Sequence, residues 1–260
     1  MSEAAAVDGA AAERAAYIHI PFCRRRCPYC DFAVVDMSRA VSPVDRYVDA
    51  VVAEIAMERE WQPLHAINLG GGTPSALSAD QIGRLVEAIS SRFGLVAGAE
   101  ISIEANPEDW TREYAGSLRQ AGINRVSLGV QSFDDAVLAA LGREHTAQQA
   151  AQAVANAQME DFPTVNLDLI FGTPGESVQS WRRTVELALE LETEHLSAYA
   201  LTVELGTDLS RAVAAGAPEP DGDDQADKYE ALVDAAGGLL HHYEVSNWAV
   251  PGSECRYNLT

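Results

Sequence analysis

The chain has 260 residues and a formal net charge of −21, from 18 basic and 39 acidic side chains. This length suffices for one barrel-sized α/β domain with a substantial core. The acidic balance argues against a nucleic-acid partner, which would need lysines and arginines to neutralise phosphates. No apolar run is long enough to indicate a membrane span.

Residues 1–16 are rich in alanine, contain acidic residues and lack the apolar stretch of a signal peptide, so they predict a disordered tail. Only four cysteines occur, and three of them are clustered. A secreted disulfide framework would spread its cysteines along a shorter chain. We therefore expect a cytoplasmic protein.

From residue 17 onward, short apolar strands alternate with amphipathic helices. Such alternation indicates a parallel sheet with helices outside it, and the absence of a dinucleotide glycine pattern favours a partial (β/α)6 TIM-like barrel over a Rossmann sheet. After residue 201 the pattern breaks into a loop at 215–224, a helix at 225–236 and a strand at 241–246. The strands are expected at 17–20, 66–69, 100–104, 125–130, 164–171 and 195–201, and the helices near 44–55, 79–93 (capped by Ser78), 111–121, 134–141, 146–159 and 177–191.

Polar and glycine-rich segments follow the ends of these strands, at 70–74, 104–107, 131 and 168–175. In barrels the functional residues gather at the carboxyl ends of the strands. We therefore expect these segments to meet at one mouth, although they are far apart in sequence.

The first strand leads into Cys23, Cys27 and Cys30, with the spacing C-x3-C-x2-C. Three thiolates at this spacing can hold three irons of a [4Fe–4S] cluster and leave the fourth iron open to another ligand. A zinc or redox site is the alternative. A structural zinc site normally has four ligands, and no further cysteine or histidine occurs between Cys30 and His65.

Three consecutive arginines, at 24–26, lie inside the cysteine loop. They are consistent with a solvated loop or with a contact to an anionic ligand.

The motifs together resemble the radical S-adenosylmethionine superfamily. Within it they resemble the branch of the oxygen-independent coproporphyrinogen III oxidases and the heme chaperones of the HemW type. The oxidase is expected to carry a further cysteine two residues after Cys30, where this chain has Phe32, so the resemblance favours the HemW type. The matching segments are 18–23, 27–30, 70–75, 104–107, 127–133, 141–143, 166–172, 195–197 and 243–246.

The resemblance implies that Cys23, Cys27 and Cys30 bind a [4Fe–4S] cluster whose open iron takes S-adenosylmethionine. Taken one by one, some of the cofactor positions have plainer interpretations: a strand-to-helix turn for the glycines, a solvated carboxylate for Glu104, and an Arg143–Asp168 ion pair. The implied cofactor-binding residues are Tyr17, Tyr29, Gly71, Gly72, Thr73, Glu104, Gln131, Arg143 and Asp168.

By resemblance the chain is a heme chaperone, and the alternative is radical decarboxylation of coproporphyrinogen III. The implied partners are heme or porphyrin, an electron donor for the cluster, a membrane respiratory enzyme that receives heme, and a second copy of the chain. We divide the chain into a barrel at 17–205 and the beginning of a C-terminal region at 206–260, which the resemblance predicts to be incomplete.

The family's His-Asn-x-x-Tyr-Trp motif, linked to heme binding, would begin at Tyr257, so tyrosine replaces the expected histidine. By residue type alone, His195, His241, His242 and Cys255 are further candidates for heme ligands, and His195 is expected to be structural.

Overall fold

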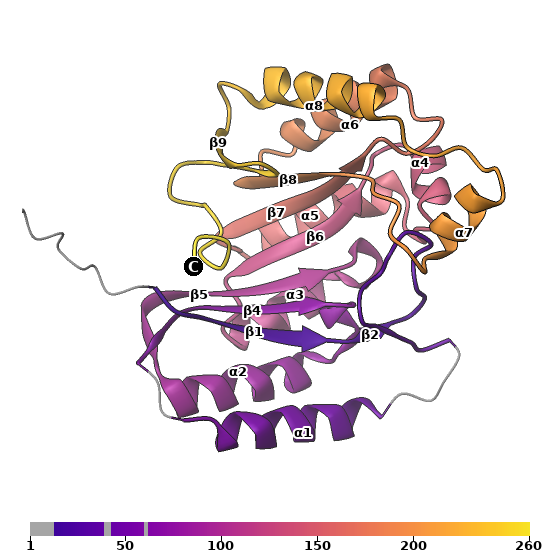
Figure 1. The fold of residues 1–260 in the computed structure, drawn as a ribbon. Coiled ribbons are helices and arrows are strands. Elements are labelled where there is room, and N and C mark those ends of the chain that lie inside the picture. Colours follow the sequence, from indigo (N-terminus) through magenta and orange to yellow (C-terminus); the bar gives the residue numbers. More distant parts are fainter. Residues whose placement is uncertain (1–12, 39–42, 60–61) are drawn as a thin grey trace, which may run out of the picture.

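The computed structural model describes residues 13–38, 43–59 and 62–260. Its main sheet has eight strands in the order β1-β4-β5-β6-β7-β8-β10-β9. The first six are parallel neighbours, and β10 and β9 extend the sheet as antiparallel strands. Figure 1 shows the parallel strands pointing toward one edge, where the loop around β2 lies.

Six β-then-α units confirm the predicted partial barrel. The parallel strands are β1 (Ala15–Ile20), β4 (Leu64–Gly71), β5 (Leu95–Ala105), β6 (Arg125–Gln131), β7 (Thr164–Phe171) and β8 (His195–Ala200). We call the carboxyl edge of these six strands the mouth. Two short strands, β2 (Phe22–Cys23) and β3 (Val35–Asp36), pair with each other beside it.

Most of the helices cover the outer face of the sheet (Figure 1). Most helices begin at a side-chain N-cap, as at Ser78, where a capping box with Gln81 confirms the predicted N-cap. The helices are α1 (Val44–Met57), α2 (Ala79–Phe93), α3 (Arg112–Gln120), α4 (Asp135–Ala140), α5 (Ala147–Met159), α6 (Val178–Glu190), α7 (Asp208–Ala214) and α8 (Gly222–Ala236), with short 3-10 turns η1 (Pro74–Ala76) and η2 (Pro107–Asp109).

Two differences from the predicted boundaries have a local cause. Strand β1 begins at Ala15, inside the predicted tail, because its backbone pairs with Ala66 and Ile67 of β4 whatever the side chains are. The part of that tail at 1–12 lies outside the described residues. Helix α8 begins at 222, within the predicted loop, because the Asp221 side chain caps it by accepting from Asp224 N at 2.8 Å.

The short strands β2 and β3 were not predicted, nor were α7 and β10 (Asn247–Ala249). The predicted strand at 241–246 is shorter, β9 (His241–Glu244), and it turns into β10, which pairs with β8. Part of the predicted C-terminal region therefore belongs to the same sheet as the barrel.

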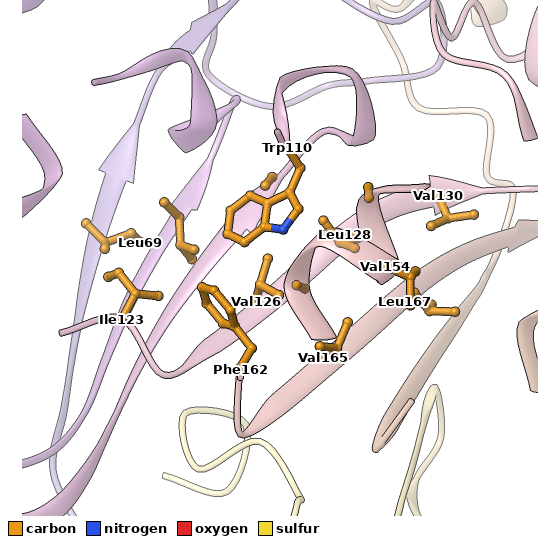
Figure 2. Close-up of a cluster of buried hydrophobic side chains, with 14 of the residues drawn as sticks. Leu69, Trp110, Ile123, Val126, Leu128, Val130, Val154, Phe162, Val165 and Leu167 are labelled. Atoms are coloured by element: carbon orange, nitrogen blue, oxygen red, sulfur yellow. The ribbon is translucent and has the colours of Figure 1, made fainter. Parts of the chain in front are cut away.

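The hydrophobic core lies between the sheet and its helices rather than inside the barrel. Figure 2 shows it around Trp110 and Phe162, whose ring centroids are 5.3 Å apart, with Val126 and Leu128 of β6 beside them. On the other face of the strands the alternate positions are polar, as with Asn166 of β7, which is 4% exposed. The barrel interior is thus a polar chamber.

The segment 253–260 lies toward the amino ends of the central strands, where Figure 1 marks the C-terminus. Arg256 N donates to Glu100 Oε1 at 3.0 Å, and the Tyr257 ring stacks on Tyr17 with centroids 5.8 Å apart. The segment is therefore fastened to both β5 and β1. Among the described helices, none combines the length and apolar character needed to cross a membrane.

Candidate functional site

The cysteine loop starts at the end of β1 and is fixed by contacts to several elements. Cys23 pairs with Asp36 in the β2–β3 ladder, and Cys30 N donates to Cys27 O at 3.2 Å. Leu209 N of α7 donates to Pro28 O at 2.8 Å. These contacts fix the backbone of the loop that carries the three cysteines.

All three cysteines are reduced and line one cavity at the mouth. Burial raises the pKa of Cys23 and of Cys30, and coordination to a metal would favour their thiolate forms. In the described part of the chain, no three His, Cys, Asp or Glu side chains are placed to hold a single metal ion. A [4Fe–4S] cluster takes each thiolate on a different iron, so this donor set fits a cluster better than zinc.

Two hydrogen-bond donors point at the cysteine sulfurs. Thr73 Oγ1 donates to Cys23 Sγ at 3.5 Å, and Arg143 Nη1 donates to Cys27 Sγ at 3.6 Å. Asn106 joins them, because its Oδ1 accepts from Arg143 Nη2 at 2.5 Å and its Nδ2 donates to Thr73 at 3.4 Å. Asn106 was not among the predicted site residues, although the segment that contains it was.

The glycines at the end of β4 allow this strand to approach the cysteine loop. A Cβ on Gly72 would lie 2.9 Å from the backbone of Pro21 and Phe22, and Gly72 N donates to Ile20 O at 2.7 Å. Gly71 has a φ of 113°, a conformation that favours glycine. The turn is therefore a cradle that any side chain would fill.

Glu104 lies at the end of β5, beside this cradle. Its Oε2 accepts from Gly71 N at 3.1 Å, and a Cβ on Gly70 would lie 2.4 Å from Oε1 and 2.9 Å from the Tyr17 ring. Burial, and secondarily the nearby Asp168 carboxylate, raise the pKa of Glu104 to about 7. Glu104 is thus a desolvated carboxylate without a cationic partner among the described residues, and not the solvated one of the plainer interpretation.

Asp168, on β7, lies in the polar chamber and lines the same cavity as Glu104. Ser127 Oγ donates to it at 2.6 Å and Asn166 Nδ2 at 2.8 Å, yet burial still raises the pKa of its carboxyl. The alternative interpretation of an Arg143–Asp168 ion pair is wrong, because Arg143 donates instead to Cys27, Asn106 and the Gly129 carbonyl.

Gln131 and Tyr29 also line the cavity. Gln131 ends β6 with a φ of 64°, at an irregularity in the pairing with β7, so its backbone is strained at the mouth. Tyr29 packs against a small apolar cluster that includes Leu141 and Leu201. Its ring therefore fastens the cysteine loop to the far side of the barrel.

The histidine candidates have other partners. His195 is buried and uses both ring nitrogens, with Asn166 Oδ1 at 2.6 Å and Tyr243 Oη at 2.8 Å, which agrees with the structural role expected for it. Burial lowers the pKa of His195 to about 2. His242 stacks on Trp248 with centroids 4.4 Å apart, and Cys255 is buried against Glu100.

The cavity that joins these groups has a volume of about 590 Å³, within the usual range for small-molecule sites. It extends from the cysteine loop through the polar chamber to Tyr257 and Asn258. All twelve predicted cluster and cofactor residues line it: Tyr17, Cys23, Cys27, Tyr29, Cys30, Gly71, Gly72, Thr73, Glu104, Gln131, Arg143 and Asp168.

Comparison with known proteins agrees with this geometry. The family model described as "Radical SAM superfamily" matches residues 17–188, and the chain belongs to this superfamily. The family implies a [4Fe–4S] cluster and S-adenosylmethionine, which the three thiols and the glycine cradle fit.

Within the superfamily the chain is similar to proteins named heme chaperone HemW. The one from Mycobacterium tuberculosis (strain ATCC 25618 / H37Rv) is 46% identical over 252 residues, which are 94% of this chain and 64% of that protein. The one from Escherichia coli (strain K12) is 37% identical over 251 residues, with the same coverage of both. The chain thus spans less than two thirds of the length of these relatives.

Among solved structures, coproporphyrinogen III oxidase (HemN) from Escherichia coli superposes with a TM-score of 0.81 at 26% identity, covering 93% of this chain and 57% of that one. Methylornithine synthase (PylB) shares the fold at a TM-score of 0.59 and 13% identity.

Proposed function

We propose that this chain is a heme-handling radical S-adenosylmethionine protein of the HemW type, which binds heme and passes it to a membrane respiratory enzyme. The similarity to proteins named heme chaperone HemW carries this proposal. Phe32, which takes the place of the cysteine expected in the oxidase, supports it. The reduced thiols suit the cytoplasm, and an electron donor and a second copy of the chain are further proposed partners.

In this proposal Cys23, Cys27 and Cys30 hold the cluster, which supplies one-electron reduction of bound S-adenosylmethionine. Thr73 and Arg143 donate to the sulfurs of Cys23 and Cys27 and hold their orientation. Such hydrogen bonds are one of the ways in which a protein sets a cluster's potential.

S-adenosylmethionine carries a sulfonium and an ammonium group, and the carboxylates of Glu104 and Asp168 suit a cationic ligand. Gly71 and Gly72 let the backbone approach that ligand closely, and Tyr17 and Tyr29 flank it with rings. Gln131 supplies an amide at the same wall of the cavity.

Coproporphyrinogen III oxidation is the second candidate, favoured by the superposition on HemN. One assay separates the two functions. The reconstituted chain is given coproporphyrinogen III, S-adenosylmethionine and a reductant, and is separately titrated with hemin. Stoichiometric hemin uptake without turnover is expected. Formation of protoporphyrinogen would contradict a chaperone-only function.

The cluster ligands are tested separately. Cys27→Ala should abolish the visible absorption of the reconstituted cluster and lower its iron content, since a three-thiolate site loses one of its anchors. Cys255→Ala is the matched control and should keep both. Retained absorption in Cys27→Ala would show that the ligands are misassigned.

A further inference from the structure

Two arginines at the mouth have unused hydrogen-bond donors. Arg25 and Arg26 line the cavity, whereas their neighbour Arg24 pairs with Asp109. Arg26 donates only through Nε, to Cys30 O at 3.0 Å. Arg25 has neither an ion pair nor a hydrogen bond to any residue that the structure describes. In a chain of net charge −21, this pair of guanidinium groups gives the cysteine loop a local positive charge.

Besides Tyr17, which stacks on Tyr257, two exposed aromatic side chains line the same cavity. Phe32, on the cysteine loop, is 57% exposed, and Tyr199, at the end of β8, is 43% exposed. Neither exposed ring face contributes to the core of the fold. Aromatic rings at a cavity wall offer flat apolar area at small entropic cost, and they bind planar ligands well.

Charged side chains of both signs line the cavity, and they differ in how far they are already bonded. The strands carry the Glu104 and Asp168 carboxylates, which suit a cation, with Arg125 and Arg143, whose guanidinium groups are bonded to protein. The cysteine loop carries Arg25 and Arg26 next to Asp31, so it keeps a net positive charge that suits an anion. One cavity can therefore hold two different ligands, a cationic one at the strands and an anionic one at the cysteine loop.

We propose that the cysteine-loop side of the cavity binds a planar tetrapyrrole dicarboxylate, with its ring against Phe32 and Tyr199 and its carboxylates on Arg25 and Arg26. This inference rests on the proposed heme-handling function and assigns that function to a site. Guanidinium groups pair with carboxylates through two parallel N–H donors, so the arginines also fix the edge by which the ring enters. Phe32 then acts as a stacking surface, where the oxidase is expected to have a thiol.

The test is hemin titration of the reconstituted chain with S-adenosylmethionine present, followed by absorbance. Arg25→Gln and Phe32→Ala should each weaken hemin binding about three- to tenfold, from the lost ion pair and the lost stacking surface. The matched controls are Arg84→Gln and Met57→Ala, which remove an arginine and an exposed apolar side chain far from the mouth, on α2 and α1. They should change hemin affinity less than twofold.

Hemin dimethyl ester separates the two contributions. Its carboxylates are blocked, so Arg25→Gln should have no effect on its binding, whereas Phe32→Ala should weaken it as much as it weakens hemin binding. Equal effects of Arg25→Gln on both ligands, or an unchanged hemin affinity in both variants, would overturn the inference. So would a loss of S-adenosylmethionine binding in Arg25→Gln with hemin affinity intact, because the arginine would then serve the cofactor.

The failure of the site and the failure of the function give different results. If the unaltered chain takes up no hemin, the proposed function falls and the site falls with it. If it takes up hemin and the variants do so equally well, only the site is wrong. Iron content checks that each variant keeps its cluster, and Phe32→Leu, which removes the ring and keeps apolar bulk, replaces Phe32→Ala if that variant loses iron.

Discussion

Replacing Glu104 by glutamine should stabilise the protein at alkaline pH and weaken its hold on S-adenosylmethionine. Burial raises the pKa of Glu104 from 4.5 to about 7 in the folded chain. Between these two values the folded state binds more protons than the unfolded state, so this group's contribution to stability falls as pH rises through that window. Glutamine stays neutral and keeps a carbonyl oxygen that can accept from Gly71 N.

The raised pKa corresponds to roughly 3 kcal/mol of destabilisation at pH 8.5, and to less than about 1 kcal/mol at pH 5. Residual access of Glu104 to the cavity reduces both figures. For a chain of this size, 1 kcal/mol shifts Tm by about 2–4 °C. We therefore expect Glu104→Gln to raise Tm by about 4–8 °C at pH 8.5 and by clearly less at pH 5.

The assay is thermal unfolding of the cluster-free, reduced chain at both pH values, with Glu87→Gln as the control because Glu87 lies on the exposed face of α2. Calorimetric titration of the reconstituted protein then measures S-adenosylmethionine affinity, which should fall in Glu104→Gln. A Tm gain that is equal at pH 5 and pH 8.5, or a Tm loss at pH 8.5, would refute the reasoning from a desolvated carboxylate.

Three further substitutions test the cluster site and the packing of the scaffold behind it. Gly72→Ala should cost roughly 2–3 kcal/mol in the free energy of unfolding and lower cluster occupancy, since its Cβ would meet backbone at 2.9 Å; Gly83→Ala, with ordinary contact at 3.6 Å inside α2, should be neutral or stabilising by thermal unfolding. Arg143→Gln removes a cation and a hydrogen-bond donor from Cys27. It should therefore lower the cluster's midpoint potential by up to about 60 mV, which is a tenfold change in the equilibrium constant of a one-electron reduction. An EPR-monitored redox titration measures this potential, and an unchanged or higher value would contradict the prediction. Lys228→Met should destabilise the chain by about 3–5 kcal/mol in denaturant unfolding, because it leaves a fully buried carboxylate 3.5 Å away without its partner.

The six repeating units could be predicted because their information is local. Each helix carries an apolar stripe for the sheet, and caps such as Ser78 mark where helices begin. The meeting of the site residues at one mouth followed from the direction of parallel strands alone.

Other features depended on information that spacing does not carry. The alternation of side chains along a strand separates two faces but does not say which face points into the barrel. Barrel interiors are usually filled by apolar side chains, whereas here the polar face, which carries Asn166, points inward. Helix α7 has no buried residue, so the sequence contains no apolar stripe that would predict it. The Thr207 N-cap and the hydrogen bond from Leu209 N to Pro28 O fix this helix in place. The partners of Arg143 are set by three-dimensional packing, which is why the alternative of an ion pair with Asp168 was wrong.

The polar chamber has a consequence for how this protein can change. Because the core lies between the sheet and the helices, residues that face the chamber contribute little apolar burial to folding. Substitutions there can alter what the cavity accepts while leaving the scaffold intact, provided that each buried polar group keeps a partner. One face of each strand thus determines which ligand binds, and the opposite face determines whether the chain folds. Substitutions that change ligand specificity can therefore accumulate during evolution on the first face without changes to the core on the second.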